Sequence, residues 1–251
     1  MNVEDSEELH GAVAGVTRIG RTVHRESGPW SPAVHELLGY LRSVRFKGVP
    51  NVKGYDNRGR EVLTYVDGRG VPVDDEVVLD EVLVGAVTWL RGYHDVVDGF
   101  RPEGIRTWRG GPDFLEDHQI ICHNDPGAYN WIIQSGRFVA MIDWDMAGPG
   151  QPLDDLAFML WTGIPLYRDI GPEESARRLE LAAEAYGEFG PLQILRAVEP
   201  RMLEAARRIQ AGIDIKDPGI VNLQKIGEPQ RTRDRVAAFV ERRDAIAAAL
   251  G

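Results

Sequence analysis

Short apolar runs separated by turn-forming residues fill the first quarter of this chain. Alternating and β-branched residues between Gly, Asn and Asp clusters are typical of strands. A different spacing begins at Pro32, where apolar residues recur every three or four positions, as on one face of a helix. Ser31 precedes that proline and is predicted to cap the helix. The expected strands are 12–18, 21–26, 51–55 and 60–66, with the last two joined as a hairpin.

The remaining sequence has mainly helical periodicity. A Gly-rich stretch at 67–72 predicts a linker before it, and Gly, Pro and Arg residues at 100–117 predict a loop. We therefore expect an α+β fold with a β-rich lobe over 1–67, a hinge over 68–72 and a helical lobe over 73–251. Helices are predicted at 75–97, 152–161, 172–189, 191–211 and 228–250, and two further strands at 131–134 and 138–142.

Composition narrows the range of function classes. The chain has 251 residues, 43% of them hydrophobic, and no apolar run approaches the roughly 20 residues of a membrane span. Its acidic N-terminus does not resemble a signal peptide. Cys122 is the only cysteine, which excludes an internal disulfide. These features favour a cytoplasmic protein without a membrane partner.

The formal net charge of −10 disfavours a nucleic-acid partner, which would require a basic face. The acidic excess lies in residues 71–251. It would attract a cationic small molecule, although acidic surfaces are also common in proteins that bind no cation.

Three residues near the middle of the chain carry the clearest chemistry. Asp125 is followed five residues later by Asn130, and Asp143 comes after a short apolar stretch. Phosphoryl transfer to an alcohol needs one carboxylate to orient the hydroxyl and two oxygen ligands for Mg²⁺ on the nucleotide phosphates. Each residue alone would be an ordinary turn or cap residue, whereas the spacing of all three favours this chemistry.

The motifs His123-Asn124-Asp125 with Asn130, Ile142-Asp143-Trp144 and Asp155-Leu156-Ala157 resemble the aminoglycoside phosphotransferase family. The resemblance implies a two-lobe protein-kinase-like fold, ATP or GTP as phosphate donor, Mg²⁺, and a small alcohol as acceptor. Antibiotic resistance is an expectation at the level of the family.

The resemblance also implies a role for each matching residue. Asp125 corresponds to the catalytic base, and Asn130 and Asp143 correspond to the Mg²⁺ ligands. The residues implied to support the catalytic loop are His123 and Asp155, and those implied to bind adenine through the hinge backbone are Thr64 and Val66.

The nucleotide-binding part departs from the family's pattern. A strand lysine usually holds the α- and β-phosphates, but the four lysines lie at 47, 53, 216 and 225, and Arg25 occupies the matching position. Arginine binds phosphate but is bulkier than lysine. Its partner on the following helix would be His35 or Glu36. The loop expected to cover the phosphates offers only Gly11 and Gly15.

Asp145 lies two residues beyond Asp143, so on a continued strand both side chains would face the same side. Asp145 is then either a further metal or substrate contact or a solvated loop residue.

Two other functions remain to be weighed against a kinase. The missing lysine favours a nucleotide- or ligand-binding module without turnover. A hydrolase with paired carboxylates, Asp143 with Asp145 or Asp154 with Asp155, would leave the spacing of Asp125 and Asn130 unexplained.

Overall fold

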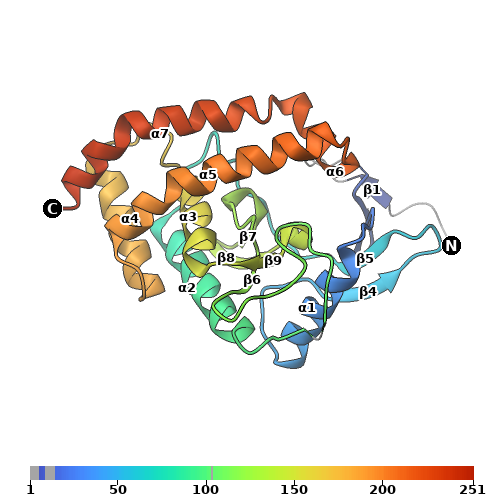
Figure 1. Cartoon of the computed structure of the whole chain (residues 1–251). Helices are drawn as coiled ribbons and strands as arrows, with labels where there is room; N and C mark the ends of the chain where they lie inside the picture. The colour runs from blue at the N-terminus through green and yellow to red at the C-terminus, as the bar shows by residue number, and fades with distance from the viewer. Residues whose placement is uncertain (1–5, 9–14, 103) are drawn as a thin grey trace.

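The structure is a computed structural model that describes residues 6–8, 15–102 and 104–251. A five-stranded antiparallel sheet and one helix form the N-terminal part, and helices form most of the remainder (Figure 1). The predicted α+β fold class is thereby confirmed. The lobe boundaries at 67 and 73 stay a prediction.

The sheet has the order β1-β2-β3-β5-β4. Its strands are β1 (Ser6–Glu8), β2 (Thr17–Ile19), β3 (Thr22–Arg25), β4 (Val52–Tyr55) and β5 (Glu61–Thr64). In β3 and β5 the register sets Arg25 directly opposite Glu61. Helix α1 (Ser31–Ser43) buries an apolar face that includes Leu37 and Leu41. Apolar spacing therefore predicted α1, β3, β4 and β5. It did not predict β1, and residues 12–14 of the strand expected at 12–18 lie outside the described residues.

Two details near the helix starts differ from the prediction. Ser31 is the first residue of α1 rather than its cap, and its hydroxyl accepts a hydrogen bond from the Gly28 N–H at 2.9 Å. The helix expected from residue 75 begins at Asp80 as α2 (Asp80–Val97). Asp75 and Glu76 instead donate their backbone N–H groups to Pro72, which makes a turn.

The helical part encloses two small β-pairs. Strands β6 (Ile120–Cys122) and β9 (Gly148–Gly150) pair with each other, as do β7 (Trp131–Gln134) and β8 (Arg137–Met141). The turn between β7 and β8 consists of Ser135 and Gly136, which both have positive φ. That combination matches the right-handed twist of a two-residue hairpin. The prediction found β7 and β8 but not the three-residue strands β6 and β9.

The C-terminal helices stack across this β-structure. They are α3 (Pro152–Gly163), α4 (Pro172–Tyr186), α5 (Pro191–Asp214), α6 (Pro218–Val221) and α7 (Gln230–Ala249), with short 3-10 turns at Ala128–Asn130, Trp144–Met146 and Asn222–Ile226. Trp131, Trp144 and Trp161 are at most 2% exposed and form part of the core. Within the described residues, no helix has the length and apolar character needed to cross a membrane.

Candidate active site

The segment that follows β6 carries Asp125 on a tightly held loop. Asn124 adopts a left-handed conformation, with φ of 62°, which turns the chain out of the strand. The 3-10 turn Ala128–Asn130 then buries Ala128 and Asn130. The Ala128 N–H donates to the Thr162 hydroxyl of α3 at 2.7 Å. The loop is thus fixed to the helical core at both ends.

Asp155 holds the start of this loop from the first turn of α3. Its carboxylate is fully buried and accepts hydrogen bonds from the backbone N–H groups of His123 and Asn124, both at 2.7 Å. His94 of α2 lies 3.2 Å from the same carboxylate. Burial opposes the charged form, but the His94 contact and the backbone N–H groups outweigh it and keep the pKa of Asp155 below its usual value.

His123 lies in the core rather than at the surface. Its Nε2 is 3.2 Å from the Ile142 carbonyl oxygen, and its ring packs on Trp144 with a centroid distance of 4.5 Å. Burial lowers the pKa of His123. A neutral, packed imidazole is suited to bracing two segments of chain.

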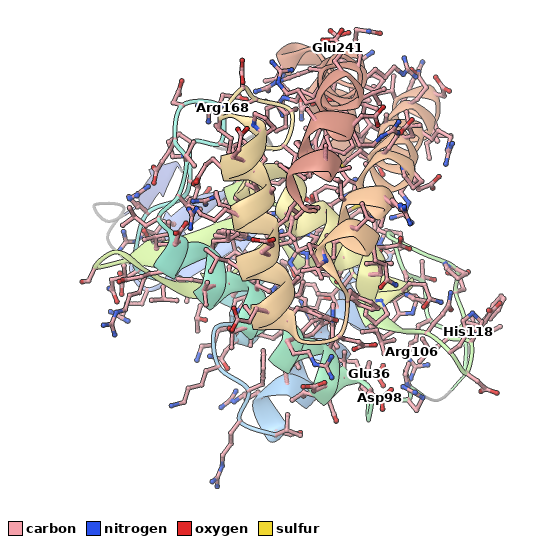
Figure 2. The ribbon with its side chains drawn as sticks, turned by 90° about the vertical axis from the view of Figure 1, so that its left-hand side faces the viewer. Glu36, Asp98, Arg106, His118, Arg168 and Glu241 are labelled. Carbon is pink, nitrogen blue, oxygen red and sulfur yellow. The ribbon has the colours of Figure 1, made fainter. Side chains whose placement is uncertain are left out.

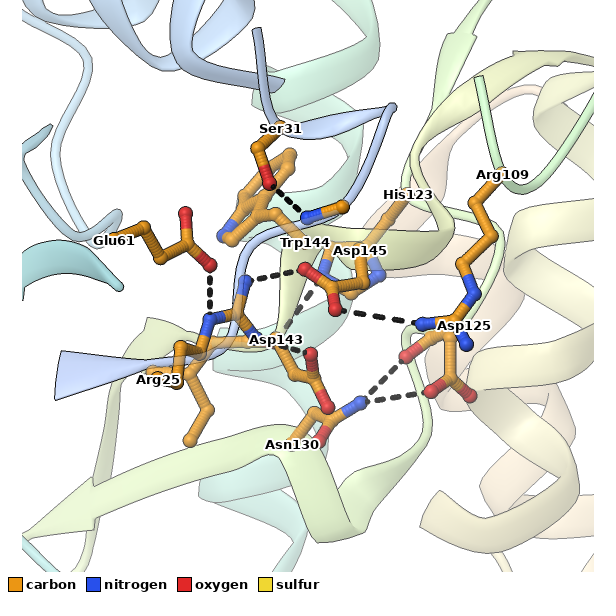
Figure 3. A network of polar contacts seen from close by, with 12 residues as sticks. Arg25, Ser31, Glu61, Arg109, His123, Asp125, Asn130, Asp143, Trp144 and Asp145 are labelled. Carbon is orange, nitrogen blue, oxygen red and sulfur yellow. Dashed lines mark hydrogen bonds and ion pairs between the residues drawn. The ribbon is translucent and has the colours of Figure 1, made fainter. Parts of the chain in front are cut away.

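Asp125 and Asn130 contact each other directly (Figure 3). The Asn130 amide nitrogen donates to the Asp125 carbonyl oxygen at 2.9 Å and lies 3.2 Å from Asp125 Oδ2. Burial, aided by the Asp143 charge, raises the pKa of Asp125 to about 7, against the opposing effect of hydrogen bonds from Tyr129 and Asn130. The carboxyl group can therefore exchange a proton near neutral pH.

Asp143 follows hairpin strand β8 and also has a left-handed backbone, with φ of 61°. The chain then enters the 3-10 turn Trp144–Met146. The strand does not continue through Asp145, and a metal or substrate contact by Asp145 stays a prediction. The side chains of Asp143 and Asp145 nevertheless lie close together, because both accept hydrogen bonds from the guanidinium of Arg25 (Figure 3).

Arg25 reaches this cluster from the end of β3. Its Nη1 donates to Asp143 Oδ1 at 2.8 Å, its Nη2 to Asp145, and its Nε to Glu61. Burial opposes the charge of Arg25, but the three carboxylates raise its pKa above the usual value. Arg25 therefore stays a cation and connects the sheet to the segment after β8.

The partner of Arg25 is Glu61, which the sequence did not indicate. Glu61 is 1% exposed, and its second oxygen lies 2.8 Å from His35 Nε2 on α1. Glu36 instead binds Arg106, with 2.6 Å between Nε and Oε2, and Figure 2 shows the two residues near each other in the lower part of the view. His35 thus supports the pair through Glu61, while Glu36 takes no part.

A second arginine, Arg109, was also missed. It lies 3.5 Å from Asp145 and 2.5 Å from Asp217, and its guanidinium stacks over Trp30. Burial raises the pKa of Asp145, whereas the positive charge of Arg25 opposes that rise. The neighbouring Gly110 lies so close to Met146 that an added Cβ would collide with its carbonyl oxygen. The glycines that follow Arg109 in the sequence could have indicated this close packing.

The structure describes only some of the residues expected to bind the nucleotide. Gly15 precedes β2 with φ of 91°, and Gly11 lies outside the described residues. The Thr64 N–H donates to the Asn51 carbonyl oxygen, so it is not available to an adenine ring. Val66 lies in the segment just after β5. Adenine binding by Thr64 and Val66 stays a prediction.

The donor atoms at the centre of the cluster suit Mg²⁺. Carboxylate and amide oxygens are hard ligands, and Mg²⁺ usually keeps several waters beside one or two protein oxygens. Because the Asn130 nitrogen is committed to Asp125, its amide oxygen remains for a metal. Asp143 is 35% exposed, so its second oxygen remains reachable. Asn130 and Asp143 therefore fit the ion.

One surface hollow of about 580 Å³ lies along the start of α7 and is lined by residues such as Ile226, Arg231 and Arg235. It includes none of the residues described above. The geometry of the polar cluster, rather than this hollow, therefore locates the candidate active site.

Comparison with known sequences gives a family and a relative. The model of the family described as "Phosphotransferase enzyme family" matches residues 107–200, which include Asp125, Asn130 and Asp143. The trifolitoxin immunity protein of Rhizobium leguminosarum bv. trifolii is 36% identical over 192 residues. That match covers 70% of this chain and 72% of the relative.

Solved structures with a similar fold include a kinase and an aminoglycoside phosphotransferase. Amicoumacin kinase, in complex with AMP-PNP, Ca²⁺ and its ligand Ami, matches with a TM-score of 0.64 and 13% identity over 98% of this chain and 89% of that one. The gentamicin complex of APH(2″)-IIa matches with a TM-score of 0.59 and 14% identity over 94% and 93%. The predicted protein-kinase-like fold is confirmed.

Proposed function

The chain belongs to the phosphotransferase enzyme family, and from this premise we propose that it is a small-molecule kinase, which transfers the γ-phosphate of ATP or GTP to a hydroxyl group. The observation that carries the proposal is the convergence of Asp125, Asn130 and Asp143. These residues come from a loop, a 3-10 turn and the end of a hairpin, yet they share one polar cluster.

In this proposal Asp125 orients the acceptor alcohol and receives its proton. The transition state of phosphoryl transfer is loose, so positioning matters more than early proton removal. A carboxyl group with a pKa of about 7 is suited to accepting that proton near neutral pH. Asp155 and His123 act as positioning residues, because they hold the loop on which Asp125 lies.

Asn130 and Asp143 would hold Mg²⁺ through their side-chain oxygens. When bound, Mg²⁺ neutralises charge on the transferred phosphoryl group. Arg25 would bind phosphate oxygens with the planar guanidinium that now contacts Asp143 and Asp145. Glu61 and His35 keep that guanidinium at the edge of the sheet. Asp145 contributes by holding Arg25 and by its contact with Arg109.

The acceptor that we propose is an aminoglycoside-like or other small alcohol, of the kind found among antibiotics. The name of the Rhizobium relative refers to immunity against trifolitoxin, and one structural neighbour binds gentamicin. The net charge of −10 favours a cationic acceptor.

Release of ADP or GDP tests the proposal. Wild-type protein and Asp125→Ala would be assayed with Mg²⁺ and each nucleotide against aminoglycosides, other antibiotics, trifolitoxin, choline, homoserine and sugar alcohols. We expect release that depends on one acceptor class and falls at least about 100-fold in Asp125→Ala, because general base catalysis contributes on this order. Nucleotide binding should be retained, since Asp125 contacts the acceptor. Near-normal turnover by Asp125→Ala would refute the assignment.

The alternative is a protein that binds a nucleotide without turnover. The ion pairs of Arg25 with three carboxylates favour it, because phosphates must compete with all three. Mg²⁺-dependent nucleotide binding, together with no product from any acceptor, would support this alternative.

A further inference from the structure

Tyr129 takes no part in the functions proposed above, yet its hydroxyl donates a hydrogen bond to Asp125 Oδ1. Tyr129 is 41% exposed, whereas its neighbours Ala128 and Asn130 are buried. The 3-10 turn therefore directs Tyr129 outward, and the ring then bends back to the carboxylate. The other oxygen of Asp125 faces the Asn130 amide nitrogen.

Gly127 makes room for this arrangement. A Cβ atom added to Gly127 would lie 2.5 Å from Cε1 and 2.6 Å from Cζ of Tyr129. The Asn130 N–H donates to the Gly127 carbonyl oxygen at 2.9 Å, which keeps the turn closed beneath the ring. Gly127 has φ of −59°, so its backbone would accept other residues. The missing side chain is thus needed by the ring and not by the backbone.

A kinase acceptor must place its hydroxyl where Tyr129 now places its own. The reacting alcohol donates its proton to the catalytic carboxylate from hydrogen-bond distance. Oδ2 of Asp125 already faces Asn130, so the acceptor approaches Oδ1. An alcohol or water that approaches Oδ1 from the position of the Tyr129 hydroxyl must displace that hydroxyl.

We propose that Tyr129 is a gate at the acceptor site, whose hydroxyl occupies Asp125 until an acceptor hydroxyl replaces it. This inference rests on the proposed kinase function. The gate suppresses wasteful hydrolysis of nucleotide, in which a water oxygen bonds to the γ-phosphorus, the bond to the bridging oxygen breaks, ADP leaves, and a water proton passes to Asp125. A specific acceptor opens the gate because its remaining contacts offset the lost Tyr129 hydrogen bond.

The test uses water itself as the probe acceptor. Phosphate release from Mg²⁺–ATP, without any other acceptor, would be measured for wild type, Tyr129→Phe and Tyr129→Phe combined with Asp125→Ala. We expect Tyr129→Phe to raise release about tenfold, because a hydrogen bond to a charged group is removed. The increase should vanish in the double variant. Structural damage would lower release rather than raise it.

Two further variants sharpen the result. Gly127→Ala retains the Tyr129 hydroxyl but displaces the ring, so it should also raise phosphate release. Tyr40→Phe removes a hydroxyl that donates to the Val96 carbonyl oxygen at 3.1 Å rather than to Asp125, and should leave release unchanged. Melting temperatures of all variants would show that each one folds.

Each remaining outcome has a definite meaning. Unchanged release in both Tyr129→Phe and Gly127→Ala, with wild-type release that depends on Asp125, overturns the gate but preserves the kinase. Phosphotyrosine at position 129, detected by mass spectrometry after incubation with Mg²⁺–ATP, also overturns it, because Tyr129 would then be an acceptor. If wild type and all variants neither bind nor hydrolyse nucleotide, the kinase function fails, and the gate fails with it.

Discussion

At the scale of single residues, Arg25 shows why the chain departs from the usual lysine. Its guanidinium has donors in a fixed planar fork, which lets one side chain contact Glu61, Asp143 and Asp145 at once. A lysine ammonium at the same position would be a compact charge on a flexible stem. The three-way contact therefore requires the arginine.

Arg25→Lys should consequently weaken nucleotide use. We expect kcat/KM for Mg²⁺–ATP to fall on the order of tenfold, because at least one hydrogen bond between charged groups, worth about 1.5 kcal/mol, is lost. Steady-state kinetics with a saturating acceptor would measure it. Arg21→Lys is the matched control, since the Arg21 side chain is 84% exposed and lies 3.5 Å from Asp67. Equal kinetics for the two variants would contradict this role of Arg25.

The sequence predicted residues within one motif better than partners across strands. Asp125 and Asn130 are close in sequence, and their contact is local. Glu61 was missed because its contact with Arg25 depends on the pairing of β3 with β5, which sequence spacing does not reveal. Arg109 was missed because its partners Asp145 and Asp217 are both distant from it in the chain.

At the scale of elements, α3 and α2 together hold the loop that bears Asp125. Asp155, on the first turn of α3, accepts two backbone N–H groups from that loop, and His94 of α2 contacts it from the other side. Tyr186 of α4 extends the network, because its hydroxyl lies 2.7 Å from His94 Nδ1. Three helices thus position one loop through a single buried carboxylate.

Asp155→Asn should destabilise the protein by about 3 kcal/mol at pH 7, because it disrupts a buried charged network. The folded-state pKa of Asp155 is lowered, so its contribution is present above its unfolded pKa of about 4 and is lost as pH falls below that value. Urea unfolding at pH 7 and pH 3.5 should therefore show a smaller difference between wild type and variant at the lower pH.

Asp154→Asn, at the exposed neighbouring position, should change stability by less than about 0.5 kcal/mol. A difference between wild type and Asp155→Asn that grew at low pH would contradict this account of Asp155.

The sequence predicted those helices and strands in which the apolar pattern extends over enough residues to show its periodicity. Helices α3, α4, α5 and α7 and the β7–β8 hairpin lie close to their expected ranges. The strands β6 and β9 have three residues each, and β9 is Gly148-Pro149-Gly150, which has no strand-like composition. Their pairing is a result of tertiary packing.

At the scale of the whole molecule, segments that precede α2 pair with the β7–β8 hairpin. Met141 donates its N–H to the Gly48 carbonyl oxygen at 2.9 Å. Arg69 and Ile133 exchange backbone hydrogen bonds at 2.9 and 2.8 Å. The β7–β8 hairpin is therefore covered on both edges by chain that precedes it, which protects its backbone groups.

Gly48→Ala tests how much this connection stabilises the molecule. Gly48 has φ of 79°, and an added Cβ would lie 2.6 Å from Trp89 Nε1 and 3.0 Å from the Val139 carbonyl oxygen. We expect a loss of about 3 kcal/mol, from left-handed strain and overpacking together. Gly59→Ala shares the positive φ but meets no atom within 4 Å, so it should cost only about 1 kcal/mol. Equal losses in thermal or urea unfolding would exclude a contribution from the Gly48 contact.

The edge pairing of the β7–β8 hairpin also has a consequence for the order of folding during translation. Gly48 and Arg69 leave the ribosome before Ile133 and Met141, so the segments that cover the hairpin are already present when it emerges. A chain interrupted before Asp143 would have Arg25 and Glu61 but neither carboxylate that follows β8. Prematurely terminated products would therefore lack the polar cluster that joins Arg25 to the segment after β8.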